Sequence, residues 1–173
     1  MKERLELFRP FFVVISIFAI FVLTFLALWA FSPKDKNRQA MDISGENIMG
    51  EKVSLADNKG KLPTVLVFVD PQDEVSNELA IRLKEKIGDD YKKSIDIIAI
   101  SINEKSKKEQ IKLFDENKSK IANTIIDDGT YKKLYNISTA PVTYFINEDL
   151  TVVSSFLGTI KDKTIDDQIK RIK

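Results

Sequence analysis

The pattern of apolar and polar residues divides the chain into two unlike parts. Residues 11–31 form one long apolar run without a charged residue, in which Ser16 and Thr24 are polar. From Ile43 onward, short apolar runs alternate with longer segments in which apolar residues recur every three or four positions. Short runs bounded by turn residues are typical of buried strands, and the longer recurrence is typical of amphipathic helices. The pattern therefore predicts an α/β domain that follows a hydrophobic N-terminal segment.

Strands and helices alternate through most of this domain, and two strands follow each other near its end. We predict strands at residues 53–55, 64–69, 95–102, 123–127, 142–147 and 151–157. We predict helices at residues 70–87, 106–118 and 161–172, and a helical turn at 129–137. Helices separate the early strands, whereas a hairpin about Glu148 and Asp149 joins the last two. This order predicts a mixed sheet with helices on both faces.

The first predicted helix has recognisable start and stop signals. Asp70 supplies a side chain that caps helices, and Pro71 tolerates the first helical position. Gly88 is a typical residue for the helix end. Between these signals, the apolar positions expected to contribute to the core are Val75, Leu79, Ile81, Leu83 and Ile87.

The apolar run from Phe11 to Phe31, "FFVVISIFAIFVLTFLALWAF", contains no charged residue. At about 1.5 Å per residue it is long enough to cross a hydrocarbon core of roughly 30 Å. Trp29 lies near one end, where an amphipathic ring suits the membrane interface. The alternative is a cleaved signal peptide, but the run exceeds the usual apolar region and lacks a small-x-small cleavage site after it. We therefore predict a transmembrane helix that contacts the lipid bilayer.

Basic residues flank this run on both sides, so the positive-inside rule does not decide its orientation. They are Lys2, Arg4 and Arg9 before it and Lys34, Lys36 and Arg38 after it. A short basic tail before a first helix usually stays cytoplasmic, which predicts a single-pass cell-membrane protein with a cytoplasmic N-terminus and an extracytoplasmic domain. The predicted organisation is a tail at 1–10, a transmembrane helix at 11–31, a tether at 32–42 and a domain at 43–173.

The 173 residues include no cysteine and no histidine. This composition excludes disulfides, thiolate nucleophiles, iron–sulfur clusters and thiolate zinc sites, and it removes the usual general base near pH 7. Acidic pairs begin at Asp89, Asp127 and Asp166, but none has the spacing of a calcium loop. Asp127 and Asp128 before Gly129 are typical of a turn or a helix cap. We therefore predict no metal and no cofactor.

The domain carries no surplus of positive charge. Without residues 1–31 the chain has 24 basic and 24 acidic side chains, and no stripe of aromatic residues accompanies the lysines. We interpret the lysine-rich stretches at 92–95, 105–108 and 131–133 as solvated faces. The sequence therefore predicts no binding of nucleic acid.

The C-terminal part of the domain carries a family pattern. In "NISTAPVTYFINEDLTVVSSFLGTI", residues 136–160, a proline precedes a strand of threonine and apolar residues, and an acidic hairpin leads to a strand that ends in glycine. "GEKVSLADNKGKLPTVLVF", residues 50–68, resembles the family's opening. Together these segments resemble the redoxin branch of the thioredoxin superfamily, and within it the membrane-tethered TlpA/ResA-type thiol-disulfide oxidoreductases. The resemblance covers nearly all of residues 43–173 and implies a thioredoxin-like fold.

The family's two active-site cysteines fall on residues that carry no sulfur. Aligned from Phe68, the nucleophilic cysteine corresponds to Asp73 and the resolving cysteine to Ser76. A carboxylate at a helix start is stabilised by the dipole that acidifies a thiol, but it cannot exchange disulfides. We interpret Asp70 and Asp73 as a helix cap and a first-turn acid. Ser76 has no histidine to activate it as a nucleophile.

Pro141 is the family feature that does not depend on sulfur. The resemblance implies a cis proline beside the active-site helix, which exposes the main chain of the preceding residue, Ala140, to an extended peptide. Thr139, Ala140 and Pro141, together with Asp70 and Pro71, are therefore the candidate peptide-binding residues. In the alternative interpretation, Pro141 only fixes the turn before a core strand.

Two classes of function remain open. The first is a non-catalytic, membrane-anchored domain that binds a protein or peptide outside the cytoplasm, as an accessory or chaperone-like factor in envelope protein maturation or export. A helper that docks a separate cysteine-bearing oxidoreductase belongs to the same class. The second is a thiol-independent enzyme that uses Asp70, Asp73 or Ser76. The lack of cysteine and histidine favours the first class.

Overall fold

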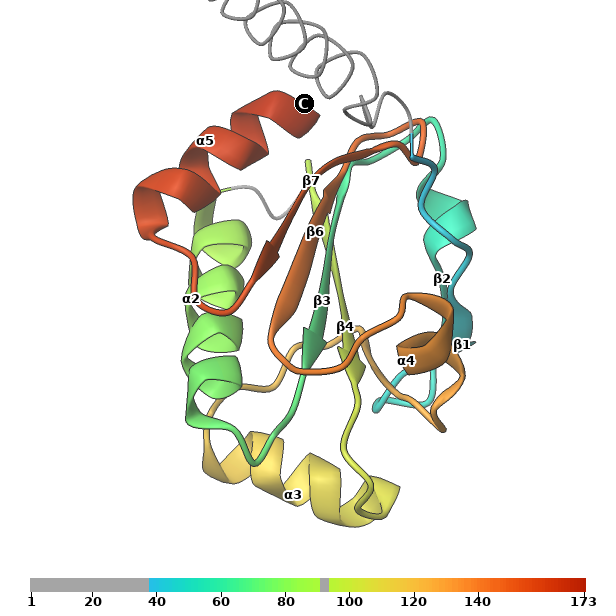
Figure 1. Cartoon of the computed structure of the whole chain (residues 1–173), viewed down its shortest axis with the longest axis vertical. Helices are drawn as coiled ribbons and strands as arrows, with labels where there is room; N and C mark the ends of the chain where they lie inside the picture. The colour runs from blue at the N-terminus through green and yellow to red at the C-terminus, as the bar shows by residue number, and fades with distance from the viewer. Residues whose placement is uncertain (1–37, 91–93) are drawn as a thin grey trace, which may run out of the picture. The chain divides into compact units, whose positions relative to one another are not determined.

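The domain is built on a five-stranded mixed sheet. The computed structural model describes residues 38–90 and 94–173, and its main strands lie in the order β5-β4-β3-β6-β7 (Figure 1). They are β3 (Thr64–Val69), β4 (Asp96–Ser101), β5 (Thr124–Ile126), β6 (Val142–Ile146) and β7 (Val152–Leu157). β3, β4 and β5 are parallel, whereas β6 and β7 form an antiparallel hairpin beside β3. This arrangement confirms the predicted mixed sheet.

Strand β3 is buried along its whole length in the centre of this sheet. A continuous apolar run suits a strand that is covered on both faces. Its side chains alternate between the faces, so Val65 and Val67 pack in one apolar cluster while Leu66 and Phe68 pack in the other. β3 therefore joins the two halves of the core.

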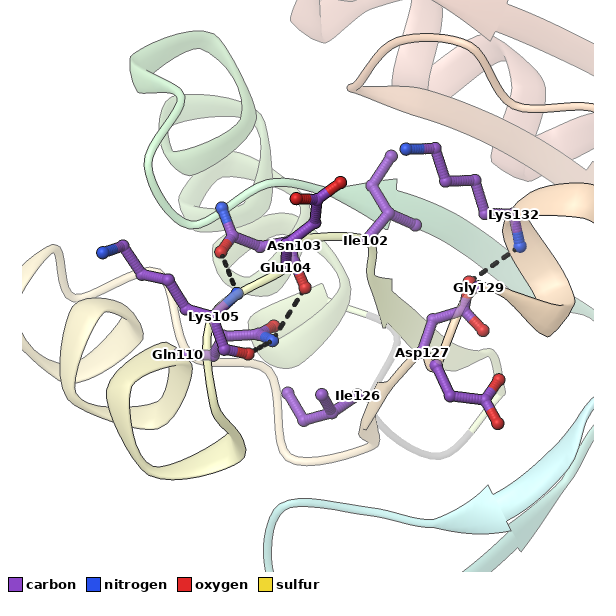
Figure 2. A pocket seen from close by; sticks show the side chains of 10 residues that line it. Ile102, Asn103, Glu104, Lys105, Gln110, Ile126, Asp127, Gly129 and Lys132 are labelled. Atoms are coloured by element: carbon purple, nitrogen blue, oxygen red, sulfur yellow. Dashed lines mark hydrogen bonds between the residues drawn. The ribbon is translucent and has the colours of Figure 1, made fainter.

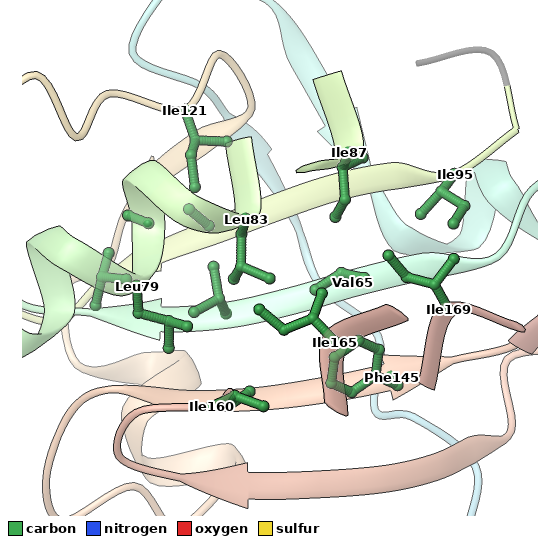
Figure 3. Packing of buried hydrophobic residues seen from close by; sticks show 14 of the residues in the cluster. Val65, Leu79, Leu83, Ile87, Ile95, Ile121, Phe145, Ile160, Ile165 and Ile169 are labelled. Carbon is green, nitrogen blue, oxygen red and sulfur yellow. The ribbon is translucent and has the colours of Figure 1, made fainter. Parts of the chain in front are cut away.

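Helices α2 (Glu74–Asp90) and α5 (Asp162–Ile172) cover one face of the sheet (Figure 1). Leu79, Leu83 and Ile87 form one apolar stripe of α2, because residues four apart lie on the same side of a helix. Figure 3 shows this stripe packed with further members of the cluster, among them Val65, Phe145, Ile165 and Ile169. The spacing of apolar residues predicted from the sequence therefore produces this layer.

Shorter elements cover the opposite face. They are the hairpin of β1 (Ser44–Glu46) and β2 (Lys52–Ser54), the 3-10 helix η1 (Leu55–Asn58) and helix α4 (Thr130–Leu134). The rings of Phe68, Tyr135 and Tyr144 lie beneath them, with centroids 5.1 to 6.1 Å apart. Burial raises the pKa of both tyrosines, so their hydroxyls stay protonated. With α4 on this face, the expectation of helices on both faces is confirmed.

Helix α3 (Lys107–Glu116) follows β4 and lies at the end of the sheet where β3 and β4 finish (Figure 1). Ser106 starts it with a capping box: its hydroxyl accepts the N–H of Glu109 at 3.3 Å, and the Glu109 carboxylate accepts the N–H of Ser106 at 3.1 Å. Two helix donors are satisfied in this way. Phe114 anchors the helix in the core.

Main-chain pairing in the described part of the chain starts at Arg38. The N–H of Ala40 donates to the carbonyl of Leu150 at 2.8 Å, and the N–H of Val152 donates to the carbonyl of Arg38 at 2.8 Å. These N-terminal residues belong to the segment that the sequence assigns to the tether. The predicted transmembrane helix at 11–31 lies outside the described residues, and within the described residues no helix is long and apolar enough to cross a membrane.

Candidate functional site

The candidate site lies at one end of the strands, where β3 finishes and β6 begins. This end of the sheet is here called the binding edge. Phe68 of β3 pairs with Val142 of β6, so the segments that adjoin them, residues 69–70 and 140–141, lie beside each other. The peptide bond between Ala140 and Pro141 is cis, as the resemblance implies. The fold therefore brings Asp70 and the loop of residues 139–141, here called the proline loop, to the same edge.

Asp73 caps helix α2. Its carboxylate accepts the N–H of Ser76 at 2.8 Å, and the helix starts at the next residue, Glu74. This bond satisfies an N–H that has no partner within the helix, and the negative charge lies at the positive end of the helix dipole. Asp73, at the position of the family's nucleophilic cysteine, therefore has a structural role as a helix cap.

Asp70 begins a turn instead of the helix, which corrects the sequence prediction. Its carboxylate accepts the N–H of Gln72 at 2.9 Å and the side-chain amide of Asn103 at 2.7 Å. A side chain that bonds to the main chain two residues later stabilises a turn in place of a helix. Pro71 consequently lies in this turn, and Asp70 links the end of β3 to the loop between β4 and α3.

Replacing the cap is expected to destabilise the domain in a way that separates hydrogen bonding from charge. Asp73→Ala is expected to lower the free energy of unfolding by about 1 kcal/mol, because the first turn loses its acceptor. Asp73→Asn retains an acceptor and is expected to stay within about 0.5 kcal/mol of the unaltered chain. Urea denaturation followed by circular dichroism measures both. An equal loss in the two variants would show that the charge, not the hydrogen bond, stabilises the helix.

Ser76 is fully buried, and its hydroxyl has no hydrogen-bond partner within the described residues. It precedes Leu79 and Ala80 by three and four positions, so it continues the buried stripe of α2 toward the core. A nucleophile must reach its substrate and needs a base, and Ser76 meets neither condition. The geometry therefore gives no support to a serine hydrolase.

The main chain of Ala140 has unused hydrogen-bonding capacity. Its N–H has no partner in the described part of the chain, and its carbonyl accepts only a long bond of 3.4 Å from the Thr139 hydroxyl. Ala140 is half-buried and Thr139 is exposed. Main-chain groups in partly buried positions are usually paired. The proline loop therefore presents one donor and one acceptor to a molecule that lies beside it.

Two large apolar side chains are exposed on the elements that meet near this edge. Val75 in the first turn of α2 is 42% exposed, and Leu157 at the end of β7, which pairs with Val142, is 68% exposed. The prediction that Val75 contributes to the core was wrong, because the buried stripe of α2 starts at Ser76. Both side chains add apolar surface outside the core.

The loop between β7 and α5 forms a further side of this edge. The N–H of Gly158 donates to the carbonyl of Pro141 at 2.8 Å, and Gly158 has a φ of +79°, which glycine adopts without strain. At the other end of the loop, Asp162 accepts a hydrogen bond from Arg82 of α2 at 2.9 Å. Sequence reasoning did not find Arg82, because nothing local distinguishes it from the other basic residues of the helix.

A pocket of about 440 Å³ lies at the ends of β4 and β5 (Figure 2). Buried Gln110 holds one wall: its amide donates to the carbonyls of Asn103 at 2.9 Å and Lys105 at 2.5 Å. Its side-chain oxygen accepts the hydroxyl of Ser101 at 2.6 Å. These bonds fix the β4–α3 loop, which in turn holds Asp70. The sequence did not indicate Gln110 or Asn103, because a polar residue on a helix or loop shows no periodic signal.

The acidic pair at the start of α4 caps that helix, as the sequence predicts. The carboxylate of Asp127 accepts the N–H groups of Tyr131 at 2.9 Å and Lys132 at 2.8 Å, and Asp128 accepts the N–H of Thr130 at 3.0 Å. Hydrogen bonds from Thr130 hold the pKa of the Asp128 carboxyl below its usual value. Within residues 38–90 and 94–173, no group of three or more histidine, cysteine, aspartate or glutamate residues is placed to hold a metal ion.

Sequence comparison agrees with this geometry. The sequence profile of the AhpC/TSA family matches residues 37–155, which is more than half of the chain. The chain belongs to the AhpC/TSA family. The match includes both the position of Asp73 and the proline loop, and it confirms the resemblance to the redoxin branch.

Individual proteins are similar to this AhpC/TSA-family chain in sequence or in structure. The thioredoxin-like protein YneN of Bacillus subtilis (strain 168) is 24% identical over 135 residues, which cover 78% of each chain. A putative thiol:disulfide interchange protein DsbE from Chlorobium tepidum has a TM-score of 0.69 at 17% identity, covering 79% of this chain and 96% of that one. StoA from Bacillus subtilis has a TM-score of 0.60 at 19% identity, covering 74% and 96%. The fold of this family member is therefore thioredoxin-like.

Proposed function

We propose that this AhpC/TSA-family domain binds extended polypeptide segments without thiol chemistry. Similar proteins are thiol:disulfide interchange proteins, but this chain has no cysteine among its 173 residues, so it cannot exchange disulfides. At the two cysteine positions, Asp73 caps a helix and Ser76 is buried. The feature that this domain shares with the family is the binding edge beside the proline loop. Binding of a polypeptide there does not require a cysteine.

The unpaired main chain of Ala140 carries the proposal. An extended segment that lies beside the proline loop accepts a hydrogen bond from the Ala140 N–H and donates one to its carbonyl, as an added strand does. Exposed Val75 and Leu157 offer apolar contacts on neighbouring elements. Recognition through the main chain tolerates many side chains, so we expect modest affinity and broad sequence tolerance.

We further propose that the domain acts outside the cytoplasm as an accessory or chaperone-like module in envelope protein maturation or export. The uncharged run at 11–31 and the short basic tail before it support an anchor with a cytoplasmic N-terminus. A tethered binding domain would meet polypeptides that emerge at the membrane surface. A separate cysteine-bearing oxidoreductase is one partner of this kind.

Removing the N–H of Ala140 tests the proposal directly. An α-hydroxy acid incorporated at position 140 replaces the amide by an ester and leaves the methyl side chain in place. Binding to the full chain in detergent is measured by fluorescence anisotropy, with labelled peptides selected from an array of short synthetic peptides. The dissociation constant is expected to rise about two- to tenfold, because one hydrogen bond is lost. The free energy of unfolding is expected to change little, since this N–H has no partner in the protein.

Asp73→Asn is the matched control for this experiment, because it alters the helix start without touching the proline loop. It is expected to leave peptide binding nearly unchanged. Binding that survives the ester but is lost in Asp73→Asn would assign recognition to the carboxylate and exclude strand addition at Ala140.

A further inference from the structure

We infer that Arg82 is the positioning residue of the binding edge, because it fixes the β7–α5 loop against the proline loop. The inference rests on the proposed function, since it concerns the same edge. Arg82 lies on α2, and its side chain is only 22% exposed. Its guanidinium is bonded to residues that follow β7, so we expect its effect on binding to be transmitted through the β7–α5 loop.

The guanidinium of Arg82 binds two residues of the β7–α5 loop and the first residue of α5. Its Nε donates to the carboxylate of Asp162 at 2.9 Å, and its Nη1 donates to the hydroxyl of Thr159 at 3.2 Å. Its Nη2 donates to the carbonyl of Ile160 and lies 2.8 Å from the Asp162 carboxylate. A planar guanidinium has several N–H donors in fixed directions and can bind several acceptors at once. A lysine ammonium does not have this arrangement of donors.

The loop that Arg82 holds is the one that contacts the proline loop. Thr159 and Ile160 directly follow Gly158, whose N–H donates to the carbonyl of Pro141 at 2.8 Å. Pro141 is bonded to Ala140, which presents the unpaired main-chain groups. A short series of contacts therefore joins the side chain of Arg82 to the residue proposed to bind a polypeptide. Loss of the guanidinium removes these contacts and leaves the Gly158 N–H and the buried side chain of Ile160 to hold the loop.

A second ion pair joins the same two helices. Lys86, one turn farther along α2, has its ammonium 2.9 Å from both carboxylate oxygens of Asp166 on α5. This pair contributes to the packing of α2 on α5, and Asp166 lies four residues beyond Asp162, the last residue that Arg82 contacts. Lys86→Ala is therefore a matched control: it removes an α2–α5 ion pair and leaves the contacts of Arg82 in place.

The test compares Arg82→Ala, Arg82→Lys and Lys86→Ala in the full chain in detergent. Hydrogen exchange, followed by mass spectrometry of fragments that cover residues 157–161, reports how firmly the loop is held. In Arg82→Ala we expect exchange there to be about tenfold faster and peptide binding to be about tenfold weaker. Arg82→Lys is expected to recover only part of each loss. Lys86→Ala is expected to change neither exchange of the loop nor peptide affinity, even if it lowers stability.

If hydrogen exchange of the loop is unchanged in a folded Arg82→Ala variant, the inference is overturned. It is also overturned if Lys86→Ala speeds hydrogen exchange of the loop as much as Arg82→Ala does. If Arg82→Ala does not fold, Thr159→Val and Asp162→Ala each remove one of the three acceptors. Both variants are expected to speed hydrogen exchange of the loop by a smaller factor. Unchanged hydrogen exchange of the loop in both of these variants would also overturn the inference. If no peptide binds the unaltered chain, the proposed function fails, and loop exchange alone decides whether Arg82 positions the loop.

Discussion

Replacing Asp73 and Ser76 together by cysteine is expected to give this domain a disulfide that can be formed and reduced. The unaltered chain is expected to show no insulin reduction, dithiol oxidation or peroxidase activity, because each reaction requires a thiolate. The double variant Asp73→Cys/Ser76→Cys is expected to reduce insulin in the presence of a small dithiol. The change is from no turnover to measurable turnover, which makes it the largest effect expected of any substitution at this site.

The first turn of α2 brings the side chain at position 73 toward residue 76. The side chain of Asp73 turns over the helix start and reaches the N–H of Ser76 at 2.8 Å. A thiol at position 73 would lie at the positive end of the helix, which lowers its pKa, whereas burial raises the pKa of a thiol at position 76. A buried thiol has little need of a hydrogen-bond partner, so Ser76→Cys also removes an unpaired hydroxyl.

The two single variants are the controls, because a chain with one thiol cannot close an intramolecular disulfide. Closure is measured by titrating free thiols before and after mild oxidation, and folding by circular dichroism. A folded double variant that keeps both thiols after oxidation would mean that positions 73 and 76 do not correspond to the family's cysteines.

Much of the fold follows from local patterns in the sequence. Strand β3 is a continuous apolar run, the centre of β4 is apolar, and helix α3 has apolar residues at helical spacing, so each was predicted close to its observed bounds. Strand β1 was not predicted, because Ser44, Gly45 and Glu46 show no apolar alternation. Its pairing with β2 is set by the tertiary structure, including the packing of Gly45 on Ile125 of the sheet edge.

The candidate site was less predictable, because its geometry depends on residues that are distant in the sequence. The start of α2 was placed too early because the turn at Asp70 is stabilised by Asn103, 33 positions away. The partners of Arg82 on the β7–α5 loop are 77 to 80 positions away. Asp73, Ser76 and Pro141 were found only because a family motif marks those positions. Motifs identify residues, whereas the contacts that fix their orientation arise only after folding.

Deleting residues 1–31 is expected to move the protein from the membrane fraction to the soluble fraction. The full chain is expected to remain with membranes in alkaline carbonate, because a span of this length and hydrophobicity inserts stably into a bilayer. The deletion is expected to leave the domain folded, since the compact unit that contains the sheet comprises Asn37–Lys173. Fractionation and immunoblotting measure the distribution, and circular dichroism of the soluble product checks its fold.

The matched control replaces residues 11–31 by an unrelated leucine-rich span, which is expected to restore membrane association because hydrophobicity and length, not the specific side chains, determine insertion. Protease added to intact cells without their wall is expected to digest the domain, because a short basic tail keeps the N-terminus inside. Release of the full chain by carbonate would contradict anchoring. A membrane-bound but protected domain would instead reverse the orientation, and the partners proposed for the proline loop would then have to be cytoplasmic.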